Sequence, residues 1–166
     1  MFCVGDKAVY PIHGAGVIEA IEEKTVLGKK QKYYVMSVQY GKMTVLIPMD
    51  NETGIGLRPV INKEEAKKVV DYFKNEPLYD DDNWNRRQRE NLSKIKSGNI
   101  YRVLDVLKDL MYREKIKGLS TSERKVLANA KQIVVSELVM SEFAGREDVE
   151  MIMDEIINNL VSKGKG

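Results

Sequence analysis

The chain has 166 residues, of which 43% are hydrophobic and 31% charged, and its formal net charge at pH 7 is +2. These proportions are typical of a folded, water-soluble protein and exclude a disordered chain. A single Cys excludes an internal disulfide, and no apolar run is long enough for a signal peptide or a membrane span, so we expect a cytoplasmic protein.

The first third of the chain carries runs of β-branched and aromatic residues, separated by turns that contain glycine. Five short strands are expected here, the clearest over residues 4–11, 17–22, 33–40 and 43–48, with turns at 13–16, 28–30 and 41–42. So many strands in about sixty residues predict a small, strongly bent β domain of Tudor-like or SH3-like size over residues 1–61. Such a domain encloses no large cavity, so an exposed strand edge is its expected binding surface for a partner protein.

A short helix and a connecting segment are expected over residues 62–82. Asn62 is suited to cap the helix, and the apolar stripe consists of Ala66, Val69, Val70 and Phe73. The helix must end before Pro77, and the polar, acidic stretch 75–82 indicates a domain boundary.

The second half begins with the only Trp, Trp84. Asp82 or Asn83 is expected to cap a helix over 84–97, because its side-chain oxygen can accept a hydrogen bond from a first-turn N–H group. Helical side chains lean toward the N-terminus, so the indole is expected to project past the end of the helix, close to Arg86 and Arg89. An aromatic ring flanked by guanidinium groups suits insertion at a DNA base step, with the cations on phosphates or in the minor groove.

The same residue has a second interpretation. Trp84, Gln88, Leu92 and Ile95 lie roughly along one helical face, so the indole could instead cover a hydrophobic core. On residue type alone this is the commoner outcome, since a lone Trp is usually well buried.

Three further helical patterns complete residues 83–166. One begins at Ile100 and ends near Gly118, one is capped by Ser120 or Thr121 and continues to Leu138, and one covers 149–160. Each apolar stripe needs a neighbour, so the four helices predict a compact all-α domain over 83–166. The expected fold class is therefore α+β, with the small β domain followed by the helical domain.

Positive charge is concentrated in one segment. Residues 84–131 carry 13 Lys or Arg against 5 Asp or Glu, whereas residues 136–166 carry 3 against 7. A solvated helical face is the ordinary explanation of surface charge, but acidic partners are scarce here and the segment begins at Trp84. The pattern favours a polyanion as partner, through backbone and minor-groove contacts without sequence-specific readout.

Catalytic and metal-binding motifs are not recognisable. Cys3 and His13 lack a third orienting group, and one Cys with one His is too few for a zinc site. The acidic run at 80–82 lacks a calcium-loop pattern and is better suited to helix capping. No glycine motif is suited to cradling a phosphate, so we expect no enzyme and no cofactor.

Two separate segments resemble the CarD-like (CdnL-type) bacterial transcription regulators. Residues 4–18, with the sequence VGDKAVYPIHGAGVI, are similar to the first motif of that family, and 83–87, with the sequence NWNRR, to the signature of its helical domain. Residues 118–120 and 123–133 resemble its later helices. The resemblance covers nearly the whole chain.

The resemblance implies an N-terminal Tudor-like domain that binds the β subunit of bacterial RNA polymerase, and a helical domain that touches promoter DNA at the upstream edge of the transcription bubble. The implied DNA-binding residues are Trp84 as a minor-groove wedge, with Arg86, Arg87, Arg89 and Arg124. The implied polymerase-binding residues are Lys24, Thr44, Val45, Leu46, Ile47 and Pro48. Leu46 is a departure, because family members can carry an Arg on this strand.

Two alternatives remain open from the sequence. The protein could be a polymerase-bound adaptor that recruits another protein, with Trp84 in its core, or a free-standing architectural DNA binder. No heptad seam is left over once the bundle is formed, so we expect a monomer.

Overall fold

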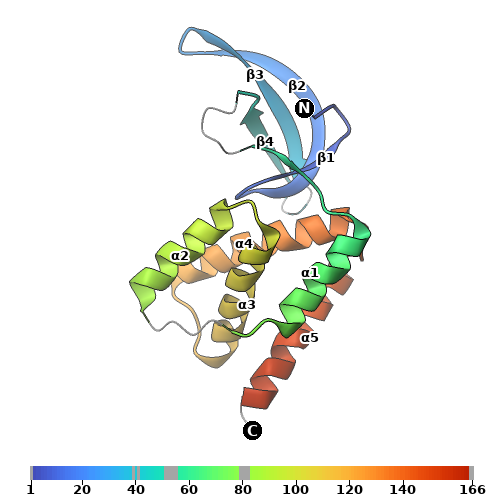
Figure 1. Cartoon of the computed structure of the whole chain (residues 1–166). Coiled ribbons are helices and arrows are strands. Elements are labelled where there is room, and N and C mark those ends of the chain that lie inside the picture. Colours follow the sequence, from blue (N-terminus) through green and yellow to red (C-terminus); the bar gives the residue numbers. More distant parts are fainter. Residues whose placement is uncertain (1, 39, 41, 51–55, 79–82, 165–166) are drawn as a thin grey trace.

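The computed structural model describes residues 2–38, 40, 42–50, 56–78 and 83–164. The strands are β1 (Lys7–Tyr10), β2 (Gly14–Val26), β3 (Lys29–Val38), β4 (Met43–Pro48) and β5 (Arg58–Pro59). The helices are α1 (Lys63–Asn75), α2 (Trp84–Lys96), α3 (Ile100–Ile116), α4 (Thr121–Met140) and α5 (Arg146–Gly164). The strands precede the helices along the chain and form a separate layer beside them, which confirms the α+β expectation (Figure 1).

The N-terminal unit is one antiparallel sheet with the strand order β4-β3-β2-β1-β5. The register of β2 against β3 shifts between Ile18 and Ala20, and such an irregularity lets a strand bend sharply. The hydrophobic core of this unit is formed by Ala8, Ile18, Tyr34, Met36, Val38 and Ile47. The sheet is therefore the small bent Tudor-like unit that the strand pattern predicts.

The hairpin between β2 and β3 is longer than predicted. Its two-residue turn consists of Leu27 and Gly28, which have φ values of 53° and 77°. Positive φ at both positions is the type I′ arrangement, whose twist matches that of the flanking strands. The predicted turn at 28–30 was thus placed slightly too late, and Lys29 and Lys30 belong to β3.

Side-chain caps begin four of the five helices. Asn62 accepts a hydrogen bond from Glu65 N at 2.8 Å, and Ser120 accepts one from Glu123 N at 3.2 Å. Asn83 and Asn99 do the same for α2 and α3. These bonds satisfy backbone donors that lack partners within a helix, so the starts of α1, α2 and α4 confirm what the capping residues predicted.

The helical unit includes α1. Ala66, Val69 and Phe73 are buried in the same hydrophobic cluster as residues of α2, α3, α4 and α5. The sequence predicted this helix as part of a short helix and linker over 62–82, and in the structure its apolar stripe packs against α3. Residues 79–82, the second part of that segment, lie outside the described residues.

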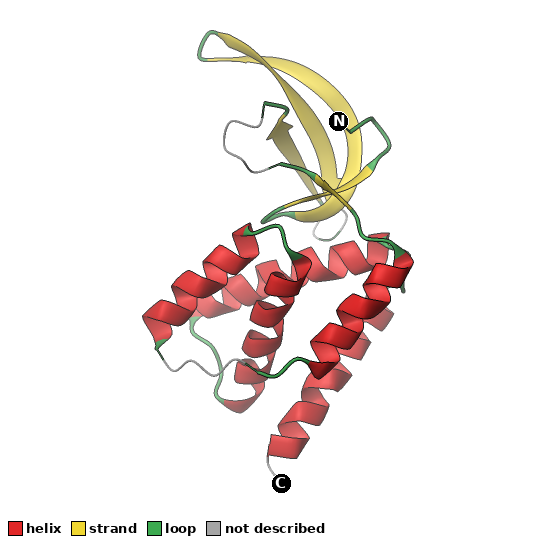
Figure 2. Ribbon diagram, in the orientation of Figure 1, coloured by secondary structure: helices red, strands yellow, loops and turns green. Residues whose placement is uncertain are grey.

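The sheet lies at one end of the helical unit. Figure 2 shows the strands gathered together, with α4 running across beneath them. The N-terminal end of α2 points away from the sheet (Figure 1). Among the described helices, none combines the length and the hydropathy that a membrane span requires.

Candidate nucleic-acid interface and open sheet edge

Trp84 is the first residue of α2 and is 44% exposed. Asn83 caps the helix by accepting a hydrogen bond from Arg86 N at 3.1 Å. The indole therefore stands at the helix end and does not cover the hydrophobic core, although its helical face continues into the buried residues Asn91 and Ile95. The other capping candidate, Asp82, lies with Asp80 and Asp81 outside the described residues.

Arg86 and Arg89 are both exposed near this end of α2. Arg86 Nε lies 3.3 Å from Glu90 Oε1 one helical turn later, and the Arg86 side chain is 63% exposed. An exposed pair of this kind contributes little and is easily exchanged for another anion. Both arginines are therefore exposed near the end of α2 that carries Trp84.

Arg87 points the other way, and the structure corrects its assignment to the DNA-binding set. Its Nη2 and Nε atoms donate to Glu123 Oε2 on α4 at 3.0 and 3.2 Å. The two side chains are only 11% and 6% exposed. The reason is its position around the helix, because Arg87 lies on the side of α2 that packs against α4. Its side chain therefore links α2 to α4 and does not face solvent.

This ion pair belongs to a buried polar cluster. Asp109 accepts two hydrogen bonds from Arg113 Nε, both at 3.2 Å, and lies near Arg87 and Glu123. Burial raises the pKa of Asp109, while the positive charge of Arg113 opposes that shift. The cluster fixes how α2 sits on the bundle and thereby fixes the direction of the Trp84 end.

Arg124 is exposed on the first turn of α4. Its Nε atom lies 3.7 Å from Glu114 Oε1, and its side chain is 63% exposed. It is accessible to an anion, but it does not lie with Arg89 on the outer face of α2.

A wide, open groove lies along the face of α2 that carries Arg89, Ser93 and Lys96. Its volume is about 570 Å³, and it is lined by Arg89, Leu92, Ser93, Lys96, Ser97 and Arg102. All three cations are exposed, and in the described part of the chain no acidic side chain forms an ion pair with any of them. The groove is therefore a positive surface along α2, the helix that begins with Trp84.

Lys96 and Arg102 were not selected from the sequence. The spacing of Arg89, Ser93 and Lys96 on one helical face was a usable signal, because residues three and four apart are neighbours. Arg102 comes from α3, and only the turn between α2 and α3 brings it to the groove.

The opposite candidate surface is β4, an edge strand that pairs with β3 alone in the described sheet. Met49 N donates to Lys32 O at 2.9 Å, and hydrogen-bonded positions alternate along an antiparallel pair. Residues 43, 45 and 47 therefore direct their backbone groups toward β3, and Thr44 and Leu46 direct theirs to the open side. Thr44, Leu46 and Pro48 also have exposed side chains, and Leu46 is 42% exposed.

Ile47 is a correction to the polymerase-binding set. Its side chain is 2% exposed and belongs to the core of the sheet, and Val45 is half-buried against the same core. The alternation of side chains along a strand explains the difference, because only one of two neighbouring residues can face outward.

Lys24 lies beyond the end of β4 on the long hairpin. Lys24 pairs with Gln31 of β3, and Pro48 pairs with Tyr33 of the same strand. Their partners on β3 are thus only two residues apart. Its side chain is 46% exposed and makes only a distant contact with Glu22 at 3.9 Å. The structure thus brings Lys24 near the outward face of β4.

Cys3 and His13, the two residues considered for a catalytic pair, lie in different surroundings. Cys3 is exposed, whereas the His13 ring stacks on Tyr10 with centroids 5.6 Å apart. Burial lowers the pKa of His13. In the described residues no hydrogen bond joins the two side chains.

Comparisons with known proteins match both units. The family model for the CarD-like/TRCF RID domain matches residues 2–61, and the model for the CarD C-terminal domain matches residues 68–154. The chain is also 42% identical over 138 residues to the Bacillus subtilis (strain 168) protein named "Putative transcription factor YdeB". That alignment covers 83% of this chain and 90% of the relative.

Proposed function

The chain belongs to the CarD-like family of transcription regulators, which interact with RNA polymerase, and on this premise we propose that it stabilises promoter open complexes by a two-point contact. The sheet binds the β subunit of RNA polymerase, and the helical unit binds promoter DNA at the upstream edge of the melted region. One copy of the chain makes both contacts.

The observation that carries this proposal is the position of Trp84. A large aromatic side chain that is 44% exposed stands in the first turn of α2, which also carries exposed arginines, at the end of the helix that points away from the sheet. Proteins that bend or open DNA insert apolar side chains between base pairs from the minor groove. We assign that role to Trp84 and assign the adjacent phosphates to Arg86 and Arg89.

Polymerase binding is assigned to the outward face and open edge of β4. Thr44 and Leu46 offer backbone groups there that have no partner strand among the described residues, and an extended segment of the β subunit can add to such an edge as a further strand. The side chains of Thr44, Leu46 and Pro48 supply specificity, with Lys24 at the margin. Leu46, where relatives can carry Arg, makes this contact apolar.

The mechanism is differential binding. Melting a promoter unstacks base pairs at a few kcal/mol per step, and the junction tends to close again. An indole that fits the opened step but not the closed duplex shifts the equilibrium toward the open state. The polymerase contact makes weak DNA affinity sufficient, because it raises the effective concentration of the helical unit at the promoter.

We expect the groove beside α2 to hold DNA phosphates through Arg89, Lys96 and Arg102. Each neutralised phosphate changes the slope of log affinity against log salt by about 0.9 for duplex DNA. The variant Arg102→Gln is therefore expected to lower the magnitude of this slope by about 1, as measured by fluorescence anisotropy with duplex DNA.

The control for that measurement is Lys163→Gln, which removes one positive charge from the exposed end of α5. An equal change in slope for both variants would mean that net charge alone, and not the groove, governs DNA affinity.

The test of the function is the lifetime of an open complex formed by the cognate RNA polymerase on a short-lived promoter. The wild-type chain is expected to lengthen this lifetime at concentrations that saturate the polymerase. An unchanged lifetime with bound protein would favour an adaptor that acts through a third partner. Equal DNA affinity with and without polymerase would favour a free-standing architectural binder.

A further inference from the structure

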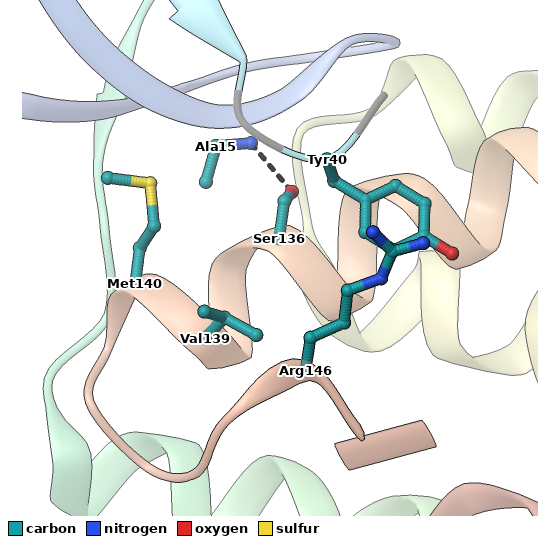
Figure 3. Close-up of a pocket in the computed structure, with 6 residues that line it drawn as sticks. All are labelled: Ala15, Tyr40, Ser136, Val139, Met140 and Arg146. Carbon is teal, nitrogen blue, oxygen red and sulfur yellow. Dashed lines mark hydrogen bonds between the residues drawn. The ribbon is translucent and has the colours of Figure 1, made fainter. Parts of the chain in front are cut away.

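One ridge of α4, formed by Gln132, Ser136 and Met140, contacts the sheet. Gln132 Nε2 donates to His13 O at 2.8 Å, and Ser136 Oγ accepts a hydrogen bond from Ala15 N at 2.9 Å (Figure 3). Lys7 Nζ donates to Met140 O at 3.2 Å. Because these α4 residues are four apart, three successive helical turns bond to β1, β2 and the turn between them.

Gly14 allows this close approach. Its φ is +99°, and a Cβ atom at this position would lie 2.7 Å from Ser136 Oγ and 3.3 Å from the backbone of Ile133. Both the backbone conformation and the space therefore require glycine where the turn meets α4.

A partly buried ion pair links the same helix to β5. Arg58 Nη1 and Nη2 donate to the two carboxylate oxygens of Glu137, both at 2.6 Å, and Ile61 N donates to Glu137 Oε2 at 3.1 Å. Glu137 is fully buried. Its carboxylate is held from the strand side by three hydrogen bonds, two of them in the bidentate geometry that guanidinium groups favour.

The same arginine reaches the connection that follows α2. Arg58 Nε donates to Gly98 O at 2.7 Å, so one side chain binds both α4 and the turn between α2 and α3. The 13 residues of α2 span about 20 Å, and Trp84 stands at the other end. Any rotation of the sheet at Arg58 would therefore displace the sheet edge relative to the indole.

A second set of contacts flanks the ridge. The Tyr40 hydroxyl donates to Glu150 Oε1 at 3.0 Å, and the Arg146 guanidinium lies 4.1 Å from the centre of the Tyr40 ring (Figure 3). An apolar cavity of about 180 Å³ lies between Tyr40, Arg146 and the α4 ridge. Directional polar contacts therefore surround this space where the two units meet.

From these contacts we infer that Arg58 and Glu137 are positioning residues, which hold the sheet and the helical unit at one fixed angle and so couple polymerase binding to DNA contact. This inference rests on the proposed function. A linked pair of contacts strengthens binding most when the link matches the distance between the two sites. A link that is rigid beforehand also loses less conformational freedom on binding.

The test uses the double variant Arg58→Met/Glu137→Met. Removing one partner alone would leave an uncompensated buried charge and risk unfolding, whereas replacing both with apolar residues of similar volume is often neutral for stability. Spin labels at Lys32→Cys on β3 and Met151→Cys on α5, with Cys3→Ser, then report the distance between the units in the free protein.

We expect a single narrow distance distribution for the wild-type pair and a broad one for the double variant. Asp109→Met/Arg113→Met, which removes a buried pair within the helical unit, should leave the distribution narrow. A narrow, unshifted distribution for Arg58→Met/Glu137→Met would overturn the inference.

Measuring the open-complex lifetime together with the two affinities distinguishes a loss of coupling between the units from a loss of binding by either unit. The double variant is expected to keep polymerase affinity and duplex-DNA affinity within about twofold, while its gain in open-complex lifetime falls by about fivefold or more. Joining Lys7→Cys to Glu142→Cys with a short thiol crosslinker, in the double variant with Cys3→Ser, should restore the gain, because these side chains meet across the two units at 3.5 Å. A full gain without the crosslink would overturn the inference.

Trp84→Ala in the same assay distinguishes the two proposals. If the wild-type chain gives no gain over Trp84→Ala, the proposed function fails and the coupling falls with it. If those two differ as proposed and the double variant equals wild type, only the inference about Arg58 and Glu137 is wrong.

Discussion

Replacing Trp84 with alanine is expected to remove most of the lengthening of the open-complex lifetime while leaving polymerase affinity unchanged. Stacking of a base on an aromatic side chain contributes about 1 to 3 kcal/mol, and about 1.4 kcal/mol corresponds to a factor of ten. The lifetime gain should therefore fall by about 5- to 140-fold. The measurement is the decay of heparin-challenged open complexes, paired with a polymerase-binding titration.

Two variants make this result specific. Trp84→Phe keeps an aromatic ring and should retain part of the gain, whereas Met151→Ala truncates another exposed apolar side chain, on α5, and should retain all of it. Because Trp84 is half-exposed and outside the core, its truncation should change the free energy of unfolding little. An equal loss of polymerase affinity and lifetime gain in Trp84→Ala would contradict the assignment of separate roles to the two units.

The variant Leu46→Glu is expected to weaken polymerase binding by about tenfold or more, because it places a carboxylate in an apolar contact where its hydration is lost. Leu46 is 42% exposed on the edge strand, so the folded sheet should tolerate the change. The affinity of the variant for duplex DNA should equal that of wild type, because α2 is untouched. A pull-down with polymerase and an anisotropy titration with DNA measure the two effects separately.

Val4→Glu is the matched control for that variant. Val4 is 60% exposed in the same unit and outside β4, so adding a carboxylate there should leave polymerase binding unchanged. Normal binding by Leu46→Glu would mean that the polymerase contacts another face of the sheet.

Local chemistry made much of this architecture predictable. The caps at Asn62, Asn83 and Ser120 act on neighbouring backbone groups, so their effect can be deduced without knowing what lies across the fold. The exposure of Trp84 needed more: its helical face agreed with both a core position and a wedge, and its place in the first turn and at the start of the basic segment favoured the wedge.

The sequence could not show which side chains of a helix or strand turn toward the rest of the fold. Arg86, Arg87 and Arg89 are indistinguishable by residue type, and the position of α4 decides that Arg87 is the one that turns inward. On β4, Leu46 and Ile47 are both apolar, so residue type could not tell which of them faces the core.

Long-range contacts lay beyond the sequence altogether. Arg58 and Glu137 are 79 positions apart, and nothing in their local pattern indicates a partner. The helix α1 was predicted from its cap and apolar stripe, but the local pattern could not show that α3 would cover that stripe.

The central claim is that the indole of Trp84 enters DNA only where the strands have separated. Because the chain has one Trp, a fluorescent tryptophan analogue excited apart from ordinary Trp reports position 84 alone, even in the presence of polymerase. We predict that its emission is unchanged when the protein binds polymerase or the closed promoter complex, and is quenched by base stacking when the promoter opens. Emission that stays the same in an open complex whose lifetime the protein has lengthened would contradict the wedge.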